Sequence, residues 1–187
     1  VRVAIQGVGK VGFELAKLLI EAGAEVCAAD IYTSNIERAE KELGSTVVEP
    51  EEILQQPVDI VAPCAMGAVI NEQTIPQLKA SIVAGSANNQ LAESRDGERL
   101  ADADILYVPD YVLNSGGLIK VYYQYFSGSD RKVVNHIDQM TQQTLPRIFT
   151  QAKELGKSTS SIADKLARER FMGCLLYTSD AADEEDS

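Results

Sequence analysis

The chain has 187 residues, 45% of them hydrophobic and 24% charged, a size and composition suited to one globular domain with a buried core. Its formal net charge of −11 argues against nucleic acid and anionic membranes as partners, because both bind basic surfaces. Its three cysteines form no CxxC pair or Cys/His cluster, no apolar run reaches ~20 residues, and no signal peptide opens the chain, so we expect a cytoplasmic protein without a disulfide framework or a metal site.

Strands and helices are predicted to alternate along the first part of the chain. Apolar runs predict strands at 1–6, 25–29, 58–62, 81–84 and 105–107. Four helices are expected between these strands. The first ends at Gly23, the second runs from Ser34 or Asn35 to Leu43, the third covers 72–78, and the fourth ends at Leu100. From about Gly116 the pattern is helical, with helices expected up to Phe126, over 131–155 and over 158–171. This order predicts an α/β fold with a doubly wound, mostly parallel sheet and C-terminal helices.

A glycine-rich turn, GVGKVG at 7–12, follows the first strand and opens the first helix. It fits the pattern G-x-G-x-x-G, in which the first glycine permits a tight turn, the second lets a pyrophosphate approach the backbone, and the third lets helix and strand pack closely. The pattern alone is weak, but an acidic residue, Asp30, closes the second strand about 20 residues further on. We therefore expect a Rossmann dinucleotide-binding domain over 1–130, with 131–173 as C-terminal helices of the same domain.

Asp30 is expected to bind the ribose hydroxyls of the adenosine half of NAD. The alternative is a solvated loop carboxylate. Three further segments follow strands, where ligands bind in open α/β sheets, and each combines small residues with amides or other polar groups: 62–68 (APCAMGA), 85–90 (GSANNQ) and 109–117 (PDYVLNSGG). Any one of these segments could be an ordinary connecting loop, but three of them on one edge of a sheet indicate a ligand site.

At these segments the chain resembles the amino acid dehydrogenase family of glutamate, leucine, phenylalanine and valine dehydrogenases, from Val1 to about Gly173. The motifs APCAMGAVIN, GSANNQL and PDYVLNSGGLI are much more specific than the glycine turn. The resemblance implies a Rossmann domain preceded by a catalytic domain, with a cleft between them. It also implies reversible oxidative deamination of an L-amino acid to a 2-oxo acid, with NAD⁺ as cofactor.

The resemblance implies a cofactor site made of the glycine turn and the loops that follow the strands. Asp30 would hold the adenosine ribose, and its neighbour Ile31 would also bind the cofactor. Cys64 and Ala65 would line the path from adenine to ribose, and Asn88 would lie near the nicotinamide ribose with Asn114 near the carboxamide. The pyrophosphate would be held by Gly7, Val8, Gly9, Lys10, Val11 and Gly12. Lys10 departs from the Asn that is usual in leucine-type members, but a cation beside a pyrophosphate is electrostatically tolerable.

For the substrate, the resemblance places Asn89 at the carboxylate and Leu118 and Val121 at the side-chain pocket. The last two are three residues apart and share a helix face. An apolar pocket excludes a charged side chain, because its desolvation is uncompensated, so we expect a preference for leucine, valine and isoleucine. The alternative is that both residues simply pack in the core.

The family's catalytic lysines and aspartate lie in its N-terminal domain, and no segment here corresponds to that domain. We therefore assign no catalytic residue, read His136 as a surface residue, and expect the chain to bind NAD⁺ without deaminating amino acids. The expected partners are a small L-amino acid, the missing catalytic domain and, in the full-length protein, further copies in a homo-oligomer. The alternatives are a phenylalanine- or valine-preferring member and, from another class, a non-catalytic NAD-sensing domain, which leaves the amide loops unexplained.

The C-terminal segment from Cys174 onward departs from the family pattern. Residues 174–183 read CLLYTSDAAD, which is the unbroken translation of a common sequencing adapter derived from a transposon end. We expect 174–187 to be a non-native, poorly packed tail. The alternative is a natural acidic C-terminus.

Overall fold

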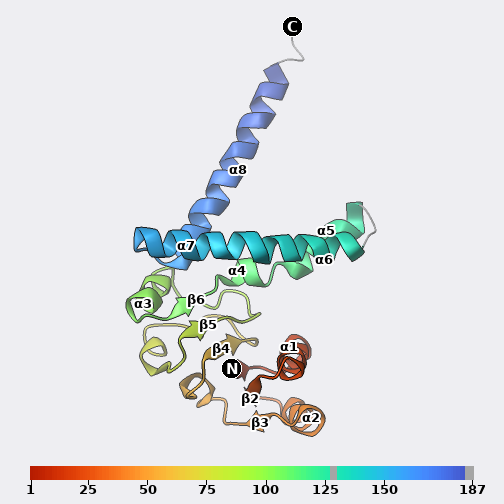
Figure 1. Ribbon diagram of the computed structural model, residues 1–187, viewed down its shortest axis with the longest axis vertical. Coiled ribbons are helices and arrows are strands. Elements are labelled where there is room, and N and C mark those ends of the chain that lie inside the picture. The colour runs from red at the N-terminus through yellow and green to blue at the C-terminus, as the bar shows by residue number, and fades with distance from the viewer. Residues whose placement is uncertain (127–129, 184–187) are drawn as a thin grey trace.

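The structure is a computed structural model that describes residues 1–126 and 130–183, with side chains described as far as Met172. A six-stranded sheet lies at its centre in the order β3-β2-β1-β4-β5-β6 (Figure 1). Every neighbouring pair of strands is parallel. The strands are β1 Arg2–Gln6, β2 Glu25–Ala29, β3 Thr46–Val47, β4 Ile60–Pro63, β5 Ile82–Val83 and β6 Leu106–Tyr107. The predicted doubly wound α/β fold is confirmed.

The direction of strand order reverses at β1, which lies between β2 and β4. Gln6 at the end of β1 is in register with Ala29 at the end of β2 and with Pro63 at the end of β4. The three loops that follow these strands therefore leave the sheet at one level. A reversal of this kind opens a crevice beyond the carboxyl ends of the strands, where ligands bind in open α/β sheets.

The two faces of β1 bury alternate residues, as expected of a strand covered on both sides. Val3 and Ile5 pack with Phe13 of α1 (Lys10–Glu21), in a cluster that also contacts α2 (Thr33–Leu43). Ala4 faces the other way and packs with Ile53, in the short 3₁₀ helix η1 (Ile53–Gln55). The glycine turn therefore sits on a strand whose position is fixed from both sides.

The C-terminal helices cover one end of the sheet and extend beyond it (Figure 1). Val112 of α4 (Asp110–Leu113) packs with α7 (Leu145–Leu155) and α8 (Thr159–Asp183). Two further helices, α5 (Gly116–Phe126) and α6 (Asp130–Gln139), lie side by side as an arm. A π-helix, η3 (Met140–Thr144), connects α6 to α7.

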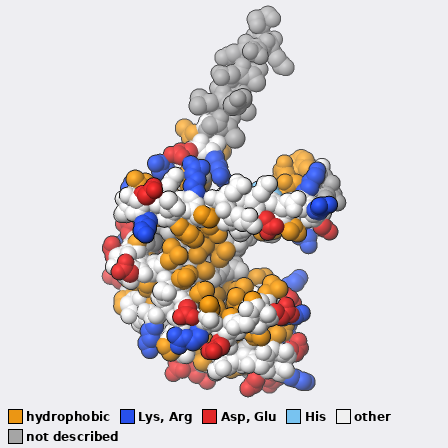
Figure 2. Space-filling view, in the orientation of Figure 1, with side chains coloured by type: hydrophobic (Ala, Val, Ile, Leu, Met, Phe, Trp, Pro, Cys, Tyr) orange, Lys and Arg blue, Asp and Glu red, His pale blue; other side chains and the backbone are white. Residues whose placement is uncertain are grey.

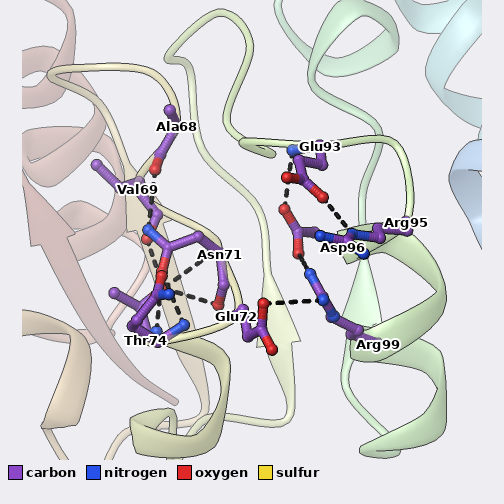
Figure 3. A network of polar contacts seen from close by, with 10 residues as sticks. Ala68, Val69, Asn71, Glu72, Thr74, Glu93, Arg95, Asp96 and Arg99 are labelled. Carbon is purple, nitrogen blue, oxygen red and sulfur yellow. Dashed lines mark hydrogen bonds and ion pairs between the residues drawn. The ribbon is translucent and has the colours of Figure 1, made fainter.

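A polar network fastens the loop between β4 and β5 to α3 (Asp96–Asp102) (Figure 3). Asp96 has no exposed surface, and its carboxylate accepts hydrogen bonds from the Glu93 N–H at 2.8 Å and from the Arg99 guanidinium at 2.6 Å. Arg99 also pairs with Glu72, at 3.1 Å, on the opposite segment. The buried carboxylate is thus paired, as a charge without water must be.

Several predicted elements differ from the observed ones. The segment 109–117, read as a loop, contains α4, and the helix expected over 72–78 is only the 3₁₀ helix η2 (Ile75–Gln77). The continuous helix expected over 131–155 is interrupted by η3, and neither β3 nor η1 was predicted. The last helix, expected to end at residue 171, continues to Asp183.

The predicted non-native tail falls mostly outside what the structure describes. Its backbone is helical as far as Asp183, while residues 184–187 and the side chains from 173 onward lie outside the described residues. Among the described residues, no helix is both long enough and apolar enough to cross a membrane.

Candidate dinucleotide site

The glycine turn connects β1 to α1 and is anchored to both neighbouring strands. The Gly7 N–H donates to the Ala29 carbonyl of β2 at 2.7 Å, and Gly7 has a φ of +91°, which L side chains rarely adopt. A Cβ on Gly7 would lie 2.5 Å from the Cβ of Ala65, in the loop after β4. Only glycine fits here, because the turn is left-handed and the next loop lies against it.

The other two glycines of the motif have contrasting surroundings. A Cβ on Gly12 would lie 1.9 Å from the Gly7 carbonyl oxygen, so the start of α1 packs directly on the turn. A Cβ on Gly9 would meet nothing within 4 Å, so the backbone at Gly9 faces open space. The next two residues, Lys10 and Val11, are exposed. The turn therefore has a closely packed inner side and an outer side that another molecule can approach.

Asp30 lies at the end of β2, beside the turn, and its carboxylate is held by three donors. Oδ2 accepts from the Val8 N–H at 2.9 Å and from the Asn35 side-chain amide at 3.0 Å, and Oδ1 accepts from the Tyr32 N–H at 2.9 Å. Ile31 beside it is 74% exposed. The carboxylate is only partly buried and retains capacity to accept a further hydrogen bond.

Helix α2 contributes two side chains that sequence reasoning missed, Asn35 and Arg38. The guanidinium Nη2 of Arg38 lies 3.1 Å from the Val8 carbonyl oxygen and 3.3 Å from that of Gly9. The same guanidinium stacks over the Phe13 ring, 4.0 Å from its centroid. No motif marks these residues, since both read as ordinary positions on a polar helix.

The loops after β4 and β5 interlock. The Cys64 N–H donates to the Gln6 carbonyl at 2.8 Å, and the half-buried Cys64 side chain packs against the core beneath α1. The Ala68 N–H donates to the Asn89 carbonyl at 2.7 Å, and a Cβ on Gly67 would lie 2.7 Å from the Asn88 carbonyl oxygen. Asn89 has a φ of +52°, a left-handed conformation that asparagine tolerates better than most residues.

The predicted amides Asn88 and Asn114 meet. The Asn114 side-chain amide donates to the Asn88 side-chain oxygen at 2.6 Å, which joins the loops that follow β5 and β6. Asn89 lines an open hollow of about 1220 Å³ that α4 and α8 also line through Tyr111 and Arg168. No residue of the glycine turn lines this hollow, so the hollow is separate from the predicted cofactor site.

Gln90 and Asp110 hold these loops together by hydrogen bonds. The sequence analysis assigned neither residue a role. Gln90 has no exposed surface, and its amide donates to the Gly85 carbonyl at 2.6 Å and to the Ala87 carbonyl at 3.0 Å. Asp110 accepts from the Gln90 N–H at 3.1 Å. Burial, and secondarily the negative charge of Asp110, raises the pKa of the neighbouring Tyr107 hydroxyl above its ordinary value.

Leu118 and Val121 lie on α5 with 75% and 62% of their surface exposed. The alternative that they pack in the core is therefore wrong. They share an exposed apolar stripe with Tyr122, Tyr125 and Phe126. Figure 2 shows the surface hollowed between the α5–α6 arm and the lobe that contains α1, with hydrophobic side chains gathered along the hollow.

His136 is exposed as predicted, with Nδ1 3.2 Å from the Tyr123 hydroxyl.

The sequence pattern described as Glutamate/Leucine/Phenylalanine/Valine dehydrogenase matches residues 31–172. Leucine dehydrogenase of Bacillus cereus is 42% identical over 169 residues, which cover 90% of this chain and 46% of the enzyme. L-tryptophan dehydrogenase of Nostoc punctiforme is 43% identical over 171 residues, which cover 91% of this chain and 48% of that protein. The chain thus spans about half the length of these relatives.

Solved structures agree with the sequence comparisons. The crystal structure of the Nostoc punctiforme L-tryptophan dehydrogenase superposes with a TM-score of 0.88 and 43% identity, over 92% of this chain and 52% of the other. A hetero-hexameric glutamate dehydrogenase from Thermus thermophilus in a Leu-bound form gives a TM-score of 0.72 at 22% identity, over 90% of this chain and 45% of that one, a likeness of fold alone.

Proposed function

This chain belongs to the glutamate/leucine/phenylalanine/valine dehydrogenase family, and we propose that it is the NAD-binding part of a leucine-type amino acid dehydrogenase. The observation that carries the proposal is the glycine turn at the strand-order reversal, with its inner side packed and the backbone at Gly9 open. Enzymes of this family generally depend on NAD or NADP. The full-length activity would be reversible oxidative deamination of branched-chain L-amino acids.

The residues present fit a dinucleotide. The glycine turn offers N–H groups at the start of α1 to a pyrophosphate, with room for its approach at Gly9. Asp30, whose carboxylate accepts the Val8 N–H of the turn, would also accept hydrogen bonds from the adenosine ribose, beside Ile31, and the neighbouring loop would contribute Cys64 and Ala65. When bound, NAD⁺ supplies the hydride acceptor for oxidation of the amino acid. The protein's own task is to hold the dinucleotide in one orientation across the sheet edge.

The paired amides Asn88 and Asn114 would fix the nicotinamide end, because an amide pair can donate to and accept from a ribose and a carboxamide. Asn89 would bind the substrate carboxylate. Leu118 and Val121 would form part of an apolar side-chain pocket, completed by the rest of the protein across the cleft. A tryptophan-type preference is the second candidate, since the L-tryptophan dehydrogenase relative is as similar as the leucine dehydrogenases.

Proton transfer requires groups that we do not assign in this chain, so we propose that it does not deaminate amino acids alone. The family's other half would supply them, in a homo-oligomer of full-length chains. The test is a chimera in which residues 1–172 replace the matching segment of Bacillus cereus leucine dehydrogenase. We expect leucine-dependent NADH formation from the chimera and none from the isolated chain. A folded chimera that binds NAD⁺ but prefers tryptophan to leucine would favour the second candidate, and one that oxidises neither would contradict the proposal.

A further inference from the structure

Arg38 is a cation held at the inner side of the glycine turn. It comes from α2, some thirty residues along the chain from the turn, and its side chain is partly buried. Its Nη2 donates to the carbonyl oxygens of Val8 and Gly9, at 3.1 and 3.3 Å, and the Phe13 ring supports the guanidinium plane at 4.0 Å. Its Nε is buried without a partner, and no ion pair joins it to a carboxylate among the described residues.

An arginine that served packing alone would not need this arrangement. Withdrawing a guanidinium from water without a carboxylate is costly, and two carbonyls and an aromatic ring offset only part of that cost. In a chain with a net charge of −11, a carboxylate partner would be easy to supply. The positive charge is instead left unneutralised beside the turn that is proposed to receive a pyrophosphate.

The geometry of the peptide group explains what the two hydrogen bonds do. In a trans peptide the C=O and the following N–H point in opposite directions within one rigid plane. The Val8 carbonyl shares its peptide with the Gly9 N–H, and the Gly9 carbonyl shares its peptide with the Lys10 N–H. Arg38 holds both carbonyls, and the Phe13 N–H also holds the Gly9 carbonyl, at 3.1 Å. The N–H groups of Gly9 and Lys10 are therefore turned away from Arg38. A Cβ on Gly9 would meet nothing within 4 Å, so the backbone there is open to another molecule.

We propose that Arg38 is a positioning residue for pyrophosphate binding: it orients the turn so that the Gly9 and Lys10 N–H groups face the pyrophosphate of the dinucleotide. This inference rests on the proposed function. The guanidinium plane is what the role requires, because Nη2 can donate to two neighbouring carbonyls while the plane stacks on the Phe13 ring. A lysine ammonium is a point charge without a plane, so it keeps the charge and loses the arrangement.

The test compares three variants of the 187-residue chain by calorimetric titration with NAD⁺, ADP-ribose and adenosine. Arg38→Met removes both the charge and the guanidinium plane, and Arg38→Lys keeps the charge only. Arg170→Met, at an exposed position on α8, is the matched control because it changes the net charge equally, far along the chain from the turn. The melting temperature of each variant is measured alongside. If Arg38→Met fails to fold, the test is the comparison of Arg38→Lys with the wild-type chain.

We expect Arg38→Met to weaken NAD⁺ and ADP-ribose binding at least about tenfold while adenosine, which lacks the pyrophosphate, changes by less than about threefold. Arg38→Lys should remain at least about threefold weaker than wild type, and Arg170→Met should match wild type. Full recovery by lysine, an equal loss for adenosine, or an equal loss in the α8 control would overturn the positioning role. A wild-type chain that binds no NAD⁺ would overturn the proposed function itself, whereas normal NAD⁺ binding by Arg38→Met would overturn this inference alone.

Discussion

We predict that Asp30 decides the choice between NAD⁺ and NADP⁺. Its carboxylate cannot swing away from the cofactor, because the N–H groups of Val8 and Tyr32 and the Asn35 amide hold both oxygens. A 2′-phosphate on the adenosine ribose would bring a second negative charge against it. Like charges brought together in this way cost several kcal/mol when water cannot screen them.

We therefore predict that the chain binds NAD⁺ at least about tenfold more tightly than NADP⁺. Replacing Asp30 with Ser should narrow the difference, since it removes the repulsion along with one ribose acceptor. Titration of the chain with both dinucleotides measures the ratio. Equal or tighter NADP⁺ binding by the wild-type chain would show that Asp30 does not have this role.

Val121 is the residue at which the predicted preference for apolar substrate side chains can be tested. In the full-length enzyme, Val121→Ser should lower the ratio of kcat/KM for leucine over glutamate by about tenfold, because it removes apolar contact and adds a hydroxyl to the pocket. Lys120→Ala, at the exposed position between the two pocket residues, is the control and should leave the ratio unchanged. An unchanged ratio in Val121→Ser would count against placing α5 at the side-chain pocket.

Among single residues, the sequence identifies those whose role depends on their immediate neighbours in the chain. It misses those whose role depends on partners that only folding brings close. The glycines are recognisable because a tight turn and a close helix require them within one six-residue segment. Arg38 and Gln90 are not, because their partners lie in other loops and their own surroundings in the sequence are unremarkable. The meeting of Asn88 and Asn114 was implied only by both lying at one sheet edge.

Tyr107, at the end of β6, should make the folded state less stable at alkaline pH. Its folded pKa is raised, mainly by burial, so above the ordinary tyrosine value of about 10 the unfolded chain releases this proton while the folded chain keeps it. The folded state then binds more protons, and its stability falls as pH rises, by about 1.4 kcal/mol per pH unit for one such group. Urea unfolding above pH ~10 should show a shallower decline in Tyr107→Phe than in wild type, whereas Tyr125→Phe, 83% exposed, should not.

The network at Asp96 fixes the start of α3 against the loop that follows β4. Asp96→Ala should lower the free energy of unfolding by about 2–3 kcal/mol, because the Glu93 N–H and the Arg99 guanidinium both lose a buried acceptor. Glu72→Gln should cost less than about 1 kcal/mol, since the Glu72 side chain is 64% exposed. Urea denaturation measures both variants. Similar losses in the two would mean that burial of Asp96 is not what gives the network its strength.

The long helices and the central strands of the fold follow from apolar spacing, and so do the two-residue strands β5 and β6, whereas β3 and α4 do not. β3 has only two residues, and it is a strand because Thr46 and Val47 pair with β2 rather than because of any pattern of its own. α4 forms inside a segment rich in turn residues, where Asp110 begins the helix and its carboxylate bonds the Tyr111 N–H at 2.7 Å. Contacts with distant parts of the chain decide such elements.

For the whole molecule, the proposed division of labour is that this part holds the dinucleotide and the rest of the protein holds the groups that move protons. The exposed apolar stripe on α5, from Leu118 to Phe126, is consistent with a surface that another part of the protein covers. The domain boundaries at 130 and 173 and the non-native origin of 174–187 stay predictions.

The most direct measurement of the central claim is calorimetric titration of NAD⁺ into the chain and into its Gly9→Val variant. Because a Cβ on Gly9 meets nothing within 4 Å, the variant should still fold, which its melting temperature checks, and its side chain should obstruct the approach of the pyrophosphate. We predict saturable binding by the wild-type chain and a loss of at least about tenfold in the folded variant. No binding by the wild-type chain, or equal binding by Gly9→Val, would contradict the account.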